Sequence, residues 1–149
     1  ALTTFVSQNR GAKEYERARK GAHFGLVCSV SLAETIGVLI ALFATPLMRL
    51  FVDDPQVIQY GVERAHYATI LFFLLAYSHG VSAVLRGVGK SVVPMVVMLV
   101  CWCLVRVTLL TMLNMLFHNI LFVYLIYPFT WSLSSIVFFL YYRKINWQE

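Results

Sequence analysis

The stretch LRGVGKSVVP, from Leu85 to Pro94, decides how this chain folds, because it separates two long apolar segments and has the composition of a tight turn. Gly87 and Gly89 can adopt the positive φ values that end a helix, and Pro94 fits only the first turn of the next one. One arginine and one lysine add positive charge. Between two membrane spans, such a turn is predicted to lie on the cytoplasmic side.

The overall composition indicates a membrane protein. Of the 149 residues, 60% are hydrophobic and only 13% are charged, and the mean hydropathy is +0.74. In soluble proteins about half of the residues are apolar and about a quarter are charged, so we predict an all-α polytopic membrane protein. Because the first residue is Ala and no signal-type segment is evident, the chain is expected to be a fragment of a longer protein.

Four apolar segments are long enough to cross a membrane as helices. The predicted spans are residues 24–47, 67–85, 92–116 and 120–142. Residues 1–8 are expected to be the end of a fifth helix, residues 9–22 a cytoplasmic loop, and residues 143–149 a cytoplasmic tail.

The basic side chains are distributed unequally between the two ends of these spans. Arg106 lies inside a span, and Arg49 and Arg64 lie at one end. Nine lie at the other end: Arg10, Lys13, Arg17, Arg19, Lys20, Arg86, Lys90, Arg143 and Lys144. The positive-inside rule makes that end cytoplasmic, so we expect a multi-pass protein of the cell membrane with a cytoplasmic C-terminus.

The formal net charge of +5 does not indicate nucleic acid as a partner. The basic connections contain no platform on which bases could stack, so membrane lipid is the expected partner of these charges. Cys28, Cys101 and Cys103 lie in apolar segments and are interpreted as small packing residues. His and acidic residues do not have the spacing of a metal site, so no metal is expected.

Small residues recur at every fourth position of the first predicted span. They are Gly25, Ser29, Ala33, Gly37 and Ala41, within a longer series that runs from residue 21 to residue 45. Such a ridge lets two membrane helices approach closely, so we predict that this face packs against protein rather than lipid.

Five segments, in order along the chain, resemble parts of the C-terminal half of the MATE (multidrug and toxic compound extrusion) transporters. They are TFVSQNRGAKEYERARKG (4–21), LFVDDPQVIQYGV (50–62), LRGVGKSVVP (85–94), LVRVTL (104–109) and YPFTW (127–131). In the family, the first three correspond to connections after the eighth, ninth and tenth helices, and the last two to pieces of the final two helices.

The resemblance implies a fold and a function. The chain would contribute four full membrane helices and the end of a fifth to a six-helix half of a twelve-helix transporter, and the missing N-terminal half would be its partner. The implied activity is secondary active multidrug efflux, in which small organic and often cationic compounds are exchanged for H⁺ or Na⁺ by rocking of two helix bundles. A transporter of this kind is not an enzyme, and it needs no cofactor besides the coupling ion.

Two alternatives remain open at this point. One is a lipid-linked saccharide flippase of the same superfamily, which would favour a wider cationic cavity than Arg106 alone provides. The other is a non-transporting membrane assembly module held together by the small-residue ridge.

Glu34 and Arg106 are the charged residues predicted to lie near the middle of the membrane. Glu34 lies about 15 Å along the first span, where an ionisable residue costs roughly 3 kcal/mol and usually has a function. It is therefore the candidate site for the coupling cation, and a fixed ion pair or a hydrogen-bonded neutral form is the alternative. Arg106 could be its partner, could cap backbone carbonyl groups, or could contact substrate.

Polar and aromatic residues in the second and fourth spans are candidates for the substrate cavity. They are Ser78, His79, Tyr127, Trp131 and Ser135. Aromatic rings suit flat hydrophobic cations, whereas hydroxyl groups and a lone His within a bundle are also common as hydrogen-bonded packing residues.

Overall fold

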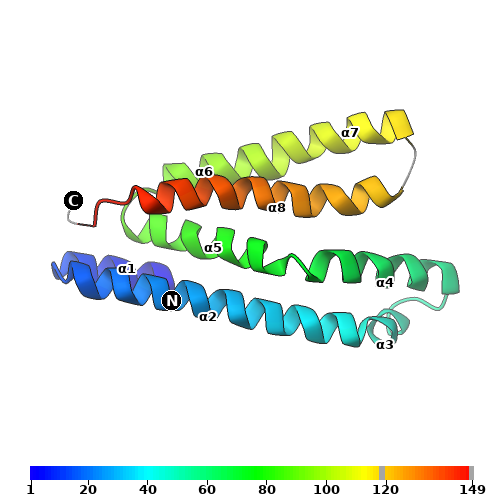
Figure 1. Cartoon of the computed structure of the whole chain (residues 1–149), viewed down its shortest axis with the longest axis horizontal. Helices are drawn as coiled ribbons and strands as arrows, with labels where there is room; N and C mark the ends of the chain where they lie inside the picture. Colours follow the sequence, from blue (N-terminus) through cyan, green and yellow to red (C-terminus); the bar gives the residue numbers. More distant parts are fainter. Residues whose placement is uncertain (118–119, 148–149) are drawn as a thin grey trace.

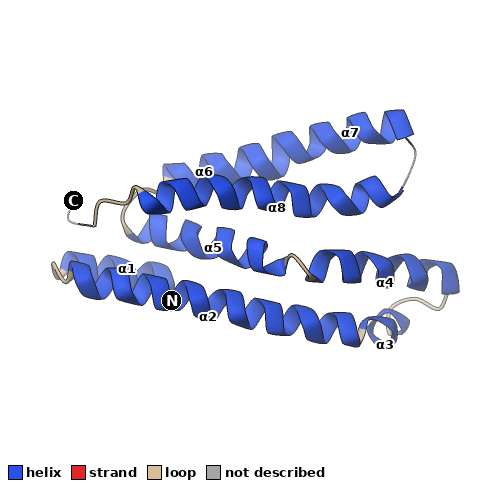
Figure 2. Cartoon of the chain, in the orientation of Figure 1, coloured by secondary structure: helices blue, strands red, loops and turns tan. Residues whose placement is uncertain are grey.

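The computed structural model of the chain describes residues 1–117 and 120–147, and this part is helical, without strands (Figure 2). The elements are α1 (Leu2–Gly11), α2 (Tyr15–Leu42), α3 (Ala44–Arg49), α4 (Pro55–Thr69), α5 (Phe72–Gly87), α6 (Val92–Met98), the π-helix η1 (Leu99–Val105), α7 (Arg106–Phe117) and α8 (Ile120–Arg143). The longer helices run side by side in an elongated bundle (Figure 1).

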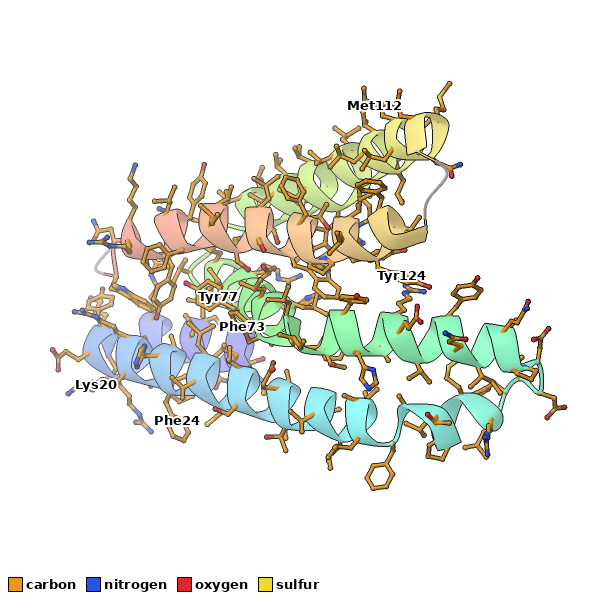
Figure 3. All side chains as sticks on the ribbon, turned by 45° about the vertical axis from the view of Figure 1, so that its right-hand side comes forward. Lys20, Phe24, Phe73, Tyr77, Met112 and Tyr124 are labelled. Carbon is orange, nitrogen blue, oxygen red and sulfur yellow. The ribbon has the colours of Figure 1, made fainter. Side chains whose placement is uncertain are left out.

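The prediction of a polytopic all-α membrane protein is confirmed. Within the described residues, three helical segments are long and apolar enough to cross a membrane: Tyr15–Leu42, Val92–Leu116 and Phe122–Arg143. A fourth crossing is formed if α4 and α5, which are bent by 56° at a short break, count as one span. Figure 3 shows Phe24 and Met112 pointing away from the bundle, and their side chains are 71% and 54% exposed, as suits contact with lipid.

Helix α2, which corresponds to the predicted span of residues 24–47, begins and ends earlier in the sequence than expected. Helix α2 starts at Tyr15, so the loop predicted for residues 9–22 is reduced to a tight turn in which Lys13 has a φ of 62°. Strong helix formers continue the helix here, and Glu16 pairs with Lys20 at 3.3 Å. At the other end, Pro46 cannot continue the hydrogen bonding of α2, and the chain bends at Phe43 into the short α3.

The second predicted span, residues 67–85, is broken where the sequence predicted a continuous helix. Helix α4 ends at Thr69 and α5 starts at Phe72. Asp54 accepts a hydrogen bond from the N–H of Gln56 at 2.8 Å and caps the start of α4. The break contains neither Pro nor Gly, so local propensity did not reveal it.

The third predicted span, residues 92–116, is helical over its whole length but irregular in its middle. The stretch Leu99–Val105 forms a π-helix between α6 and α7. Such wide turns occur mostly as local insertions in α-helices and are frequent at functional sites. This one ends directly before Arg106.

The turn in LRGVGKSVVP uses its two glycines in different ways. Gly89 has a φ of 84°, and its N–H donates to the carbonyl of Arg86 at 3.0 Å while that of Lys90 donates to the carbonyl of Leu85 at 2.9 Å. This is a Schellman motif, which requires the positive φ at Gly89. Gly87 does not have the predicted positive φ, because it still belongs to the last turn of α5.

Gly87 instead allows α1 to approach α5. A Cβ atom at Gly87 would lie 2.8 Å from the Cβ of Val6 and 2.9 Å from the carbonyl oxygen of Thr3. Around this contact, the hydroxyl of Thr3 donates to the carbonyl of Ala83 at 3.1 Å, and the guanidinium of Arg10 donates to the carbonyl of Val88. The described core lies at this end of the bundle and includes Val6, Val84, Leu85 and Phe138.

A matched pair of alanine substitutions tests this contact. Gly11 and Gly87 each end a helix, but a Cβ at Gly11 would meet nothing within 4 Å. We expect Gly11→Ala to stabilise the protein slightly, because Ala is favoured over Gly in helices by up to about 1 kcal/mol. Gly87→Ala should destabilise it by about 1 to 3 kcal/mol through overpacking. Thermal unfolding in detergent measures both, and equal shifts would contradict the close α1–α5 contact.

The structure also provides positions for a test of membrane sidedness. The α1–α2 and α5–α6 connections and the end of α8 lie at one end of the bundle, and the start of α4 lies at the other (Figure 1). In a background without the native cysteines, we expect cysteines at Lys13, Lys90 and Lys144 to be labelled only from the cytoplasm and one at Gln56 only from outside. Labelling of Lys90 and Gln56 positions from the same side would overturn the assigned topology.

Candidate functional site

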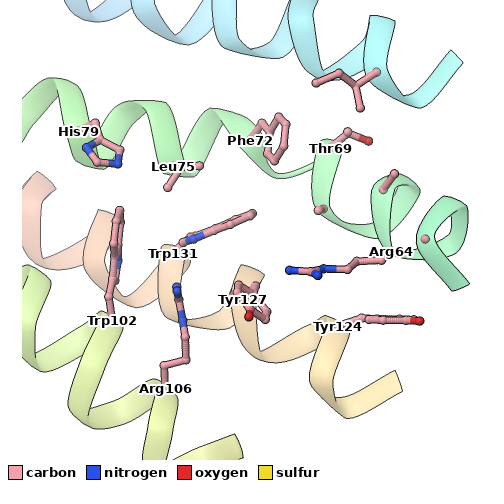
Figure 4. Close-up of a pocket in the computed structure, with 14 residues that line it drawn as sticks. Arg64, Thr69, Phe72, Leu75, His79, Trp102, Arg106, Tyr124, Tyr127 and Trp131 are labelled. Carbon is pink, nitrogen blue, oxygen red and sulfur yellow. The ribbon is translucent and has the colours of Figure 1, made fainter. Parts of the chain in front are cut away.

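A cavity of about 580 Å³ lies beside the break between α4 and α5 (Figure 4). Its walls come from α2, α4, α5, η1, α7 and α8. The lining residues are Ile40, Gly61, Arg64, Ala65, Ala68, Thr69, Phe72, Leu75, His79, Trp102, Arg106, Tyr124, Tyr127 and Trp131. The volume is in the range that holds a drug-sized molecule.

Aromatic rings form much of the cavity wall and pack against one another. Trp131 lies between Phe72 and Tyr127, with centroid distances of 6.0 and 6.4 Å. The His79 ring meets the Trp102 ring edge-on at 5.1 Å. Contacts of this geometry stabilise the rings in fixed orientations. The cavity therefore presents largely preformed aromatic faces to a ligand.

Two arginines enter this aromatic cavity, Arg64 from α4 and Arg106 from the start of α7. Their Cζ atoms lie 5.0 and 4.7 Å from the centroid of the Tyr127 ring, and that of Arg106 also lies 5.7 Å from the Trp102 ring. The Nη2 and Nε atoms of Arg106 donate to the hydroxyl of Thr130 at 2.7 and 3.2 Å. The fourteen lining residues include no Asp or Glu, so the cavity wall is cationic.

Ser78 and Ser135, predicted as cavity residues, lie instead in the buried contact between α5 and α8. The Ser78 hydroxyl is 3.0 Å from that of Ser134 and 2.9 Å from that of Ser135, and the Ser135 hydroxyl donates to the carbonyl of Leu74 at 2.9 Å. Trp102 donates its indole N–H to Ser134 at 3.2 Å. Hydroxyl groups buried in apolar surroundings need such partners. Ser78 and Ser135 thus join α5 to α8, and Ser134 positions Trp102.

Glu34 does not line the cavity, but it supports the break beside it. Its carboxylate accepts a hydrogen bond from the backbone N–H of Phe73 at 3.1 Å. Phe73 lies in the first turn of α5, whose first N–H groups have no acceptor within the helix. A negative charge is also favourable at a helix N-terminus. Glu34 of α2 thus caps α5 from a neighbouring helix.

The expected pairing of Glu34 with Arg106 is not found. Glu34 bonds to Phe73, and Arg106 bonds to Thr130 of α8, so within the described residues no ion pair joins the two. Each group has a nearer partner than the other charge. The bend of the second span, which the sequence did not reveal, supplies the partner of Glu34.

The small-residue ridge of α2 is not continuous as a packing face. A Cβ at Gly25 would lie 2.7 Å from the side chain of Leu2 in α1, and one at Gly37 would lie 3.0 Å from the Phe72 ring. Ala33 and Ala41 are half-buried, but Ser29 is exposed and donates to the carbonyl of Gly25 at 2.7 Å. The ridge therefore serves two separate contacts, one with α1 and one with the α4–α5 break.

Three of the predicted cavity residues, His79, Tyr127 and Trp131, line this cavity together with Arg106, which the sequence singled out as a buried charge, and with Arg64, which it did not single out. Arg64 was assigned to the outer interface because it precedes the most apolar part of the second span. A usable signal was present, since Gly61, Ala65 and Ala68 form a face of small residues around it. Such a face leaves room for a cavity beside a long side chain.

His, Cys, Asp and Glu side chains form no group of three that could hold a metal ion within residues 1–117 and 120–147. The cavity wall itself consists mainly of aromatic, aliphatic and arginine side chains, and Thr69 and His79 add a hydroxyl and an imidazole.

Comparison with known proteins places this chain in a family. The chain is similar to the probable multidrug resistance protein NorM of Thermotoga maritima, with 31% identity over 97 residues, and to that of Chromobacterium violaceum, with 29% identity over 97 residues. In both cases the match covers 65% of this chain and 21% of the relative, so the aligned segment spans about a fifth of each relative's length. The model of the MatE family matches residues 1–112, which include α1 to α6, η1 and Arg106. Since this match covers most of the chain, the chain belongs to the MatE family.

Proposed function

We propose that the chain is part of the C-terminal lobe of a secondary active multidrug efflux transporter. It would exchange small organic compounds for H⁺ or Na⁺, together with a second, N-terminal lobe. The observation that supports this most strongly is the drug-sized aromatic cavity at a broken span, within a chain of the MatE family. Broken helices at cavities are a common feature of secondary transporters.

The site suits binding without covalent chemistry. Aromatic and aliphatic side chains supply most of its wall, and a few polar groups can orient a ligand. We therefore propose transport rather than an enzymatic reaction, with no cofactor besides the coupling ion.

Glu34 is the proposed coupling residue because it acts on the same break that borders the cavity. Its carboxylate holds the N–H of Phe73, while the adjacent Phe72 and the preceding Thr69 line the cavity. Protonation or Na⁺ binding at Glu34 would weaken this cap, and a ligand in the cavity would contact the other side of the break. Cation and substrate would then favour different arrangements of α4 and α5, which is the requirement for coupled exchange.

One further ionisable group contacts α2 from α4 near this region. The Nε2 atom of His66 lies 3.2 Å from the carbonyl of Ala41. Its protonation would also affect the α2–α4 contact, so tests of Glu34 require a His66 control.

The proposed transport can be measured with the full-length protein in proteoliposomes. Ethidium, a flat fluorescent cation, should move against its gradient when a proton or sodium gradient is imposed, and movement should stop when an ionophore collapses the gradient. If ethidium does not move under either gradient and a lipid-linked saccharide is not translocated either, the non-transporting assembly module is favoured.

A lipid-linked saccharide flippase remains a second candidate for one reason. Its substrate is anionic, and the cavity contains two arginines where the sequence indicated Arg106 alone. Translocation of a fluorescent lipid-linked saccharide in the same proteoliposomes, without transport of ethidium, would favour this alternative.

Substitution of Glu34 tests the coupling proposal. Glu34→Gln keeps an oxygen that can accept the Phe73 N–H but cannot bind or release a proton, so we expect near-normal thermal stability and export reduced to the level seen without a gradient. Glu34→Leu removes the acceptor and should in addition destabilise the protein by about 1 to 2 kcal/mol.

Two controls accompany these variants. Glu63→Gln alters a carboxylate of α4 that accepts from Gln59 at 3.2 Å, and it should leave coupling unchanged. His66→Gln separates the contribution of His66 from that of Glu34. Gradient-driven export that persists in Glu34→Gln would remove Glu34 from the coupling role.

A further inference from the structure

A second hollow lies at the end of the bundle that is predicted to be cytoplasmic, and it shares no lining residue with the cavity beside the α4–α5 break. It measures about 600 Å³ and lies between the first turns of α2 and the end of α8. Both helices pack on α5, and Figure 1 shows them on opposite sides of it. This hollow, called the basic groove below, therefore opens between two helices that are joined through α5.

Basic side chains of α2 line one part of the basic groove. Arg19, Lys20 and His23 are all exposed there. Glu16 is the one acidic side chain in the described wall, and it pairs with Lys20 at 3.3 Å. The two side chains of this pair are 88% and 80% exposed, and exposed ion pairs contribute little to stability. Lys20 can therefore exchange Glu16 for another anion at little cost.

The sequence around the groove carries the same sign of charge. Residues 10–23 contain five Lys and Arg and two Glu, a formal charge of +3. The cytoplasmic leaflet of a membrane is negative, and its attraction strengthens binding by about fivefold for each basic side chain near the surface. The charge of this region is thus complementary to an anionic headgroup.

The same face of α2 becomes apolar one helical turn further on. Phe24 follows Lys20 by four positions and Val27 follows His23 by four, so the helical repeat places each apolar residue beside a basic one. Phe24 and Val27 both line the groove and are exposed, and Figure 3 shows Lys20 and Phe24 pointing away from the bundle. The order along α2, basic first and apolar deeper in the membrane, is that of the headgroup and acyl chains of a phospholipid. A free phosphate would use the basic part alone.

The end of α8 supplies the opposite wall of the groove. Tyr142 lines it, and the Tyr142 ring meets the Trp147 ring edge-on at 6.3 Å. Ile145, which lies between them in the sequence, is buried in the core and holds the chain after α8 against the bundle. Tyr and Trp are enriched at the level of lipid headgroups. The aromatic wall is therefore preformed and suited to the same depth as the basic side chains.

We propose that the basic groove binds an anionic phospholipid of the cytoplasmic leaflet. Arg19, Lys20 and His23 contact its phosphate, and Phe24 and Val27 contact an acyl chain. The bound lipid bridges α2 and the end of α8, which otherwise meet through α5. Such a site does not depend on the transport proposed above.

Phosphatidylglycerol and phosphatidylcholine with identical acyl chains form a matched pair of probes. Both have a phosphate and the same apolar part, but the choline group makes the second lipid neutral overall. We expect the purified full-length protein, freed of native lipid, to bind phosphatidylglycerol about tenfold more tightly, as measured by native mass spectrometry. Equal binding of the two lipids would overturn the proposal.

Two charge-matched variants locate the site. Arg19→Gln with Lys20→Gln changes exposed side chains, so this variant should keep its thermal stability but lose most of the preference for phosphatidylglycerol. Lys13→Gln with Lys90→Gln removes two exposed charges at the same end but outside the groove, and it should retain the preference. A preference that is unchanged in the groove variant, or equally reduced in both, would contradict the assignment.

Glycerophosphoglycerol, the same headgroup without acyl chains, distinguishes a lipid from a soluble phosphate ester. We expect it not to displace phosphatidylglycerol at millimolar concentration, because it has no apolar part to contact Phe24 and Val27. Displacement would assign the groove to a soluble anion and overturn the lipid assignment.

Discussion

A hydrogen bond from the backbone N–H of Phe73 to the carboxylate of Glu34 stabilises the region on which the cavity depends. A helix that breaks inside a membrane exposes backbone N–H groups where water is scarce, and each such group needs an acceptor. Glu34 supplies one from the neighbouring α2, with a charge that also favours a helix N-terminus. This cap supports the 56° bend between α4 and α5. If α4 and α5 formed one continuous helix, Thr69 and Phe72 would be oriented differently and would not line the cavity in their present positions.

Structural features that depend on residues close together in the sequence could be predicted from it. Apolar length predicted the membrane helices, and Gly89 and Pro94 predicted the turn after α5. The break at residues 70–71 could not be predicted in this way, because Ile70 and Leu71 are ordinary apolar residues. Its stabilising partner, Glu34, lies 39 positions away from Phe73 in the sequence.

The same distinction applies to the cavity. Tyr127, Trp131, His79 and Arg106 stand out as polar or aromatic residues within apolar segments, and each lines the cavity. Serine gives a weaker signal, because a buried hydroxyl can either contact a ligand or join two helices, and Ser78 and Ser135 do the latter. Arg64 appeared to be interfacial because its place in the cavity depends on a contact between helices, that of its guanidinium with the Tyr127 ring of α8. Side chains whose role depends on tertiary geometry are thus the ones that sequence patterns assign poorly.

The π-helix η1 changes how the third span can vary in evolution. A π turn holds about one more residue than an α turn within the same full rotation, so η1 accommodates an extra residue without turning the helix that follows. Deletion of one residue within Leu99–Val105 would therefore restore regular α-helix and leave α7 close to its present orientation relative to α6. Arg106 would still face Tyr127 and Thr130. The same deletion within the regular α6 would turn Arg106 by about 100° relative to the start of that helix, so η1 is where this span can lose one residue while the cavity keeps its guanidinium.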